Sequence, residues 1–202
     1  LKSKEKINLK ELEDLFSMEI TIKKASKKLD IIRGQVIYKG NVIDNVLTKK
    51  IISMIKERFD VQYMINFLDN LLDNPSKTAI DELYQFMEVG EIPISKDGHL
   101  YAYKKVREDF KDIYSGKFDN SIGKIIKMNR SEVDDNREKT CSNGLHFCSF
   151  DYLKNFGSNI EDKCKIVVVK VNPKDVVSIP IDYNFTKARC CKYVVVKDIT
   201  KD

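Results

Sequence analysis

The chain has 202 residues, of which 42% are hydrophobic and 33% charged, and this balance is typical of a folded globular protein rather than a disordered one. No apolar run approaches the roughly 18 residues that a membrane-spanning helix needs, and no signal peptide is expected, because the first basic residues are not followed by an apolar stretch with a small-residue cleavage site. Basic residues predominate in 1–60 and 101–202 and acidic residues in 61–100, which argues against a surface shaped for duplex DNA.

Residues 1–92 are predicted to form a helical module that contains one short β element, residues 35–38. The segments with apolar residues at helical spacing are 9–16, 47–59, 61–72 and 80–87. Pro75 separates the last two segments, and Thr78 followed by Asp81 resembles a capping box at the start of the last helix. We expect the amphipathic helices to bury their apolar faces on one another.

Residues 93–202 are predicted to form a β-rich α+β domain with a candidate ligand pocket. From residue 93 onward the period of the apolar pattern changes from 3.6 to 2, which is the period of strands. The predicted strands are 99–106, 144–149, 165–171, 176–179 and 192–199, with a short helix at 151–155. The predicted fold class is therefore α+β, with an N-terminal helical module followed by this domain.

The first predicted strand carries aromatic and basic side chains on one face and mostly apolar side chains on the other. The polar face holds His99, Tyr101, Tyr103, Lys105 and Arg107, whereas Lys104 falls among the apolar residues of the opposite face. Flat rings can stack on a base, and cations can pair with phosphates, so this face is a candidate nucleotide site. The alternative is an ordinary solvated strand face with extended lysine and arginine side chains.

His146 and Cys148 are expected to point to the same side of the second predicted strand. Together with Cys141 and either Cys190 or Cys191, they could in principle form a zinc site. Their spacing matches none of the common zinc-finger patterns, however, and an odd number of cysteines is typical of free thiols in a reducing cytosol. We therefore predict no metal.

Residues 172–193 are densely polar for a strand region, which indicates a surface with a function. Arg189 in this segment and Arg130 before it are further cations that can pair with phosphate. The predicted ligand-binding residues are Tyr101, Tyr103, Lys105, Arg107, Arg130, His146 and Arg189. No catalytic residue and no cofactor is predicted, because the sequence holds no motif of the Walker A, GxGxxG, GxSxG or HExxH type.

Several long segments together resemble the B proteins of the rapid-lysis II (rII) locus of T4-type bacteriophages. They are 67–76 (FLDNLLDNPS), 97–107 (DGHLYAYKKVR), 118–124 (FDNSIGK), 144–149 (GLHFCS), 156–158 (FGS) and 175–184 (DVVSIPIDYN). The resemblance runs from about residue 32 to residue 200. It implies a role in rapid lysis, superinfection exclusion and protection of the infecting phage from a prophage-encoded defence, and it supplies no catalytic residues. Longer members look as though they begin with a helix-turn-helix-like segment, which this chain does not show, so no duplex DNA partner is expected.

The strand-face chemistry and the resemblance together predict a phage counter-defence protein. It would bind and sequester an anionic nucleotide-type signal of the host, without any reaction, in the cytoplasm of the infected bacterium. An alternative is a lysis or superinfection-exclusion factor that acts by contact with a partner phage protein or with the inner membrane surface, to which the basic N-terminal segment would be weakly attracted.

A third hypothesis is an enzyme. The order of a strand rich in tyrosine and arginine followed by residues 144–149 is distantly similar to the core of ADP-ribosyltransferase-type folds, in which a histidine and a tyrosine hold NAD. No residue of this chain is identifiable as the acidic catalytic residue of those enzymes, so the resemblance favours a scaffold used for binding.

Overall fold

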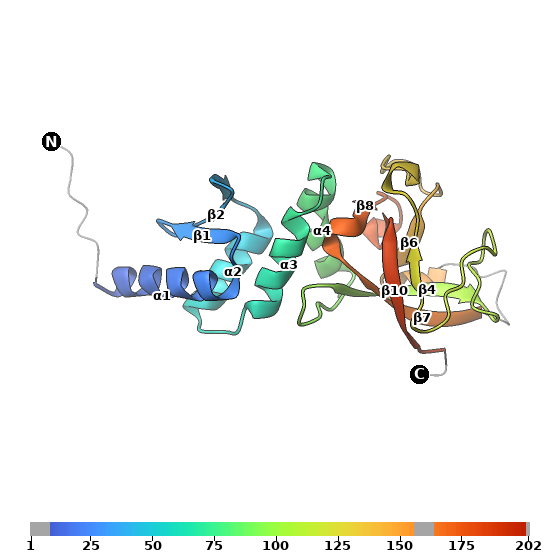
Figure 1. Cartoon of the computed structure of the whole chain (residues 1–202), viewed down its shortest axis with the longest axis horizontal. Coiled ribbons are helices and arrows are strands. Elements are labelled where there is room, and N and C mark those ends of the chain that lie inside the picture. Colours follow the sequence, from blue (N-terminus) through green and yellow to red (C-terminus); the bar gives the residue numbers. More distant parts are fainter. Residues whose placement is uncertain (1–8, 156–163, 201–202) are drawn as a thin grey trace. The chain divides into compact units, whose positions relative to one another are not determined.

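The computed structural model describes residues 9–155 and 164–200, and it confirms the predicted α+β class (Figure 1). By its internal contacts the chain divides into two compact units, Leu1–Asp69 and Asn70–Asp202. The predicted domain boundary between residues 92 and 93 rests on the change in the period of the apolar pattern, and it stays a prediction. Residues 1–8, 156–163 and 201–202 of the two predicted domains lie outside the described residues.

The first unit combines helices with a small antiparallel sheet. Its elements are α1 (Leu9–Ala25), β1 (Leu29–Ile32), β2 (Gln35–Tyr38), β3 (Asn41–Ile43), α2 (Val46–Lys56) and most of α3 (Gln62–Leu72). The predicted extended segment is confirmed as β2, which pairs with both β1 and β3. The core of this unit is apolar, since Ile22, Leu47, Ile51 and Ile65 are almost completely buried.

Two helix starts show how local side chains fix the boundaries. At α2, the Asn45 side chain accepts a hydrogen bond from the Thr48 amide, and the Thr48 hydroxyl accepts one from the Asn45 amide, which is a capping box. At α4 (Lys77–Val89), the cap is Ser76, whose hydroxyl accepts a hydrogen bond from the Ala79 amide. The predicted capping box at Thr78 is therefore wrong, because the helix begins directly after Ser76.

The second unit is built on a seven-stranded antiparallel sheet with the order β5-β10-β7-β4-β6-β9-β8. The strands are β4 (Leu100–Arg107), β5 (Ile125–Lys127), β6 (Leu145–Cys148), β7 (Cys164–Val171), β8 (Val176–Ser178), β9 (Lys187–Cys190) and β10 (Lys192–Asp198). The longest pairing joins β4 to β7 over eight residue pairs, from Leu100↔Val171 to Arg107↔Cys164. Alternate β-branched residues of β7, such as Val167 and Val169, are fully buried on one face.

Two helices cover opposite faces of this sheet around β6. Phe86 of α4 packs edge-on against Phe147, with ring centroids 5.8 Å apart. On the other face, Tyr152 and Leu153 of α5 (Tyr152–Asn155) pack against Cys148. No helix among the described residues is long and apolar enough to cross a membrane.

Candidate functional site

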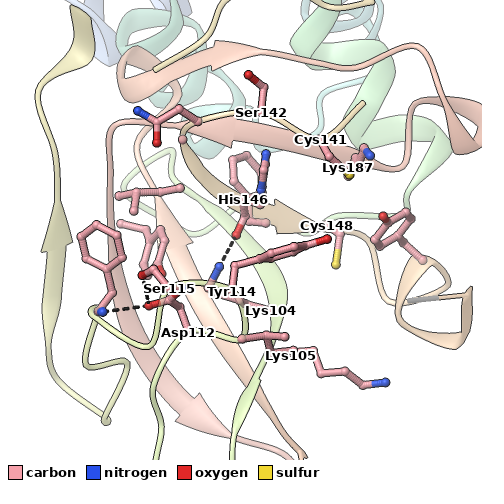
Figure 2. Close-up of a pocket in the computed structure, with 18 of the residues that line it drawn as sticks. Lys104, Lys105, Asp112, Tyr114, Ser115, Cys141, Ser142, His146, Cys148 and Lys187 are labelled. Carbon is pink, nitrogen blue, oxygen red and sulfur yellow. Dashed lines mark hydrogen bonds between the residues drawn. The ribbon is translucent and has the colours of Figure 1, made fainter. Parts of the chain in front are cut away.

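A cavity of about 410 Å³ lies in the second unit, beside the place where β4 meets β6 (Figure 2). Its walls come from these two strands, from the loops at residues 112–118 and 140–144, and from α5. The two strands are joined by one residue pair only, Tyr103↔Cys148, so the sheet is least continuous at the cavity. A volume of this size is within the usual range of small-molecule sites.

Lys104 is the most informative residue of the cavity. Its Nζ donates a 2.9 Å hydrogen bond to the carbonyl oxygen of His146 and lies 5.8 Å from the centroid of the Tyr193 ring (Figure 2). Burial lowers the pKa of Lys104 from its ordinary value. Within the described part of the chain no carboxylate forms an ion pair with this amine, so its ammonium form has donors left over for a ligand.

Asp112 organises the loop opposite Lys104. Its carboxylate accepts hydrogen bonds from the Ser115 amide at 2.7 Å, the Ser115 hydroxyl at 2.9 Å and the Phe118 amide at 2.8 Å. Burial acts to raise the pKa of Asp112, but the hydrogen bonds from these two residues outweigh it and lower the pKa. The ionised carboxylate therefore holds the loop in place rather than neutralising Lys104.

Two further lysines line the cavity, and they differ in their surroundings. Lys187 on β9 is buried and forms a 2.6 Å ion pair with Asp182. Lys105 is half-buried, and its side chain extends away from Lys104 (Figure 2). The cavity thus combines positive charge with the rings of Tyr114 and Tyr193.

His146 lines the cavity as a neutral imidazole. Burial, followed by the charges of Lys104 and Arg189, lowers the pKa of His146 to about 3. Its Nε2 is buried, and none of the described residues forms a hydrogen bond with it. A buried polar atom without a partner costs free energy, so a small movement of the His146 ring that let this nitrogen bond to a ligand would remove that cost.

Two of the three predicted arginines, Arg189 and Arg130, form hydrogen bonds that stabilise the fold. Arg189 is fully buried, and its guanidinium donates to the carbonyls of Asn136 at 2.6 Å and Lys139 at 3.0 Å and to the hydroxyl of Ser178 at 2.9 Å. Arg130 donates to the carbonyl of Lys174 and to other acceptors near β8. Neither residue is among those that line the cavity.

Three of the four predicted residues on the polar face of β4, Tyr101, Tyr103 and Arg107, also lie outside the cavity lining. The Tyr103 ring packs edge-on against Phe150, with centroids 5.2 Å apart, and Tyr101 lies 6.0 Å from the amine of Lys170. Arg107 donates to the Ile113 carbonyl at 2.7 Å and so supports the loop at 112–118. Of the seven predicted residues, the cavity brings together Lys105 and His146.

Four residues of the cavity lining are not among the predicted site residues, namely Lys104, Asp112, Tyr114 and Lys187. One signal could have found Lys104, because it is a charged residue in the buried phase of a strand between Ala102 and Val106. The other three lie in a loop or on β9, whose alternation the sequence does not show.

The cysteines near the cavity do not form a metal cluster. Among residues 9–155 and 164–200, no group of three or more histidine, cysteine or acidic residues is placed to hold a metal ion. Cys190 is buried and its thiol donates to the Leu145 carbonyl, whereas Cys141 is exposed. Burial raises the pKa of Cys148 to about 12, so its thiol stays protonated at neutral pH.

Comparison with known proteins gives one family and one curated relative. The family described as "Bacteriophage T4 protein rIIB" matches residues 4–202. "Protein rIIB" of Enterobacteria phage T4 is 43% identical over 168 residues, which are 83% of this chain and 53% of the relative. The chain therefore spans about half the length of that relative. No solved structure matches the chain.

Proposed function

Since the chain belongs to the bacteriophage T4 rIIB family, we propose that it is a lysis- and superinfection-related phage protein whose cavity binds an anionic, nucleotide-type ligand. The ligand would be a signal of the host's defence, and its sequestration would blunt that defence. Lys104 carries the proposal, because it is a half-buried and strongly desolvated amine that faces the cavity, and among the described residues its amine has one hydrogen-bond acceptor, the His146 carbonyl. Burying a charge in this way is costly unless an anion shares the site.

The aromatic lining supports a ligand that combines an anionic group with a flat ring. Tyr114, Phe118, Tyr152 and Tyr193 all contribute to the cavity wall. Tyr114 is 74% exposed, so its ring is accessible to a base that stacks on it. His146 adds a neutral hydrogen-bonding group, which can form a hydrogen bond with a polar edge of the ligand without adding charge.

The groups that face the cavity are better suited to binding than to catalysis. With a pKa of about 3, His146 is a weak general base at neutral pH. With a pKa of about 12, Cys148 holds almost no thiolate. Asp112 is already engaged by three hydrogen bonds from its own loop. These properties support binding without chemical change of the ligand.

The test is thermal unfolding and calorimetry of the protein with cyclic di- and trinucleotides, ADP-ribose, NAD and ATP. A ligand present at 100 times its dissociation constant stabilises the folded state by about 2.7 kcal/mol, so a sequestered compound raises the melting temperature clearly. We expect Lys104→Met to weaken binding at least about tenfold, because the buried charge contact is lost. Lys127→Met, on the exposed edge of β5, is the matched control and should bind normally.

Two further readouts make the outcome decisive. Tyr114→Ala changes an exposed ring and so tests the cavity even if the Lys104 variant fails to fold. The ligand released from the complex is then analysed by chromatography. Recovery of the intact compound supports sequestration, and recovery of a cleaved product contradicts it. Unchanged melting temperatures throughout would overturn the proposal of a nucleotide-type ligand.

A further inference from the structure

Helix α1 carries apolar residues on two sides, although its own unit uses only one of them. Met18 and Ile22 are buried in the unit, with 3% and 0% exposure. A second row runs along another side of the helix at intervals of three and four residues. This row, the α1 stripe, consists of Leu9, Leu12, Phe16 and Ile20, which are 78%, 44%, 67% and 48% exposed.

A helix that only packs against its own unit needs one apolar stripe and has polar residues elsewhere. Four large apolar side chains in one exposed row are therefore unusual, and a contiguous apolar patch of this kind marks an interaction surface. The spacing of the α1 stripe, over about three turns, fits another helix lying along it.

The charges of α1 indicate which helix fits. The first half of the helix carries the exposed acidic residues Glu13 and Asp14, and the last turn carries Lys23 and Lys24. Glu19 pairs with Lys23 within the helix, which leaves Lys24 available at that end. An antiparallel partner with the same sequence would place its basic end beside this acidic half, whereas a parallel copy would place like charges together.

We propose that the α1 stripe is the contact through which two copies of this chain associate, with their α1 helices antiparallel. Such a contact is isologous, so one two-fold axis satisfies both the apolar rows and the charged ends. An anionic lipid surface suits the helix less well. Its acidic residues outnumber its lysines, and Glu13 lies next to the stripe along the chain.

The first test is sedimentation of the full chain over a range of concentrations. We expect a reversible monomer–dimer equilibrium, and Phe16→Ser should weaken it at least about tenfold, because Phe16 is the largest side chain of the stripe. Phe59→Ser is the matched control, since Phe59 is a phenylalanine of similar exposure, 60%, outside the helix. Circular dichroism confirms that both variants keep their helices.

Charge exchange tests the antiparallel arrangement. Glu13→Lys with Asp14→Lys makes both ends of α1 basic and should weaken the dimer, as should Lys23→Glu with Lys24→Glu. All four substitutions together restore opposite charges at the two ends, so we expect dimerisation to return. A chain that is monomeric at every concentration overturns the proposal, and so does a fourfold variant that remains monomeric. Binding of the monomer to anionic vesicles through Phe16 would overturn it in favour of a lipid surface.

Discussion

Arg189 shows how a buried cation can be held without a ligand. Its guanidinium donates to the carbonyls of Asn136 and Lys139, so it fixes the loop that continues into the cavity wall at residues 140–144. The Arg189 side chain also limits which residue can occupy position 144, which is a glycine. Gly144 has a φ of 150°, and a Cβ there would approach the Arg189 side chain within 3.2 Å. Arg189 was predicted to bind phosphate, and the two terminal nitrogens of its guanidinium donate to the carbonyls of Lys139 and Asn136 and to the Ser178 hydroxyl.

We predict that Arg189→Met lowers the free energy of unfolding by about 2–4 kcal/mol, because the carbonyls of Asn136 and Lys139 and the buried hydroxyl of Ser178 all lose their donor. Urea unfolding followed by circular dichroism measures the change. The control is Arg107→Met, at an exposed arginine that also donates to a backbone carbonyl, and it should cost less than about 1 kcal/mol. Equal losses in the two variants would contradict the assignment of Arg189 as a buried support.

The low pKa of His146 predicts how the stability of the protein depends on pH. Its pKa in the folded protein is about 3, below the ordinary value of 6.5, so between these values the unfolded chain binds a proton that the folded chain does not. The contribution of His146 to stability is therefore present above pH 6.5 and declines as the pH falls towards 3. The decline is at most about 1.4 kcal/mol per pH unit.

We expect His146→Gln to lose less stability than the unsubstituted protein between pH 6.5 and pH 4, since glutamine has no proton to bind. Urea unfolding of both proteins at pH 7, 6, 5 and 4 gives the difference in free energy as a function of pH. The carboxylates titrate in both proteins, so their effect cancels in this difference. The pH dependence that remains is that of His146. A difference that is constant across the range would show that His146 is protonated in the folded state or exposed to solvent.

Among the elements, the connection from α3 to α4 is tied to the far end of the chain by one side chain. Asn74 is buried, and its amide donates to the carbonyls of Pro173 at 2.8 Å and Val176 at 2.7 Å. Its oxygen accepts hydrogen bonds from the Ser76 amide and from Arg130, both at 2.9 Å. All four hydrogen-bonding positions of this amide are in use, and the two bonds that it donates join segments about 100 residues apart in the sequence.

We predict that Asn74→Ala lowers the free energy of unfolding by about 2–4 kcal/mol, because it leaves several buried groups without partners. The matched control is Asn129→Ala, at an exposed asparagine with one long hydrogen bond of 3.4 Å to Glu132, and it should cost less than about 0.5 kcal/mol. Chemical denaturation of the two variants checks the difference. A small loss at Asn74 would mean that water replaces its partners.

The elements that could be predicted from the sequence are those with a regular apolar period. The strands at β4, β7 and β10 and the helices α2 and α3 are of this kind. β9 could not be predicted, because two of its four buried positions are Lys187 and Arg189, and burial of charged residues hides the alternation. The cavity shares this difficulty, since loops far apart in the sequence supply much of its wall.

At the level of the whole chain, the two compact units carry different surfaces. The first unit, Leu1–Asp69, presents the α1 stripe, and the second unit, Asn70–Asp202, holds the cavity. α4 resembles α2 in its apolar period, yet it belongs to the unit of the large sheet, where Phe86 packs on Phe147. Periodicity shows that a helix has an apolar face, and it does not show which surface receives that face.

The single pairing between β4 and β6 has a mechanical consequence. The large sheet consists of two groups of strands, β5-β10-β7-β4 and β6-β9-β8. They are joined at the junction of β4 and β6 by the pair Tyr103↔Cys148. The hydrogen bond from Lys104 to the His146 carbonyl also crosses this junction. A ligand of the proposed kind that drew the Lys104 ammonium to itself would remove this hydrogen bond, so ligand binding and the strength of the junction between β4 and β6 would be linked.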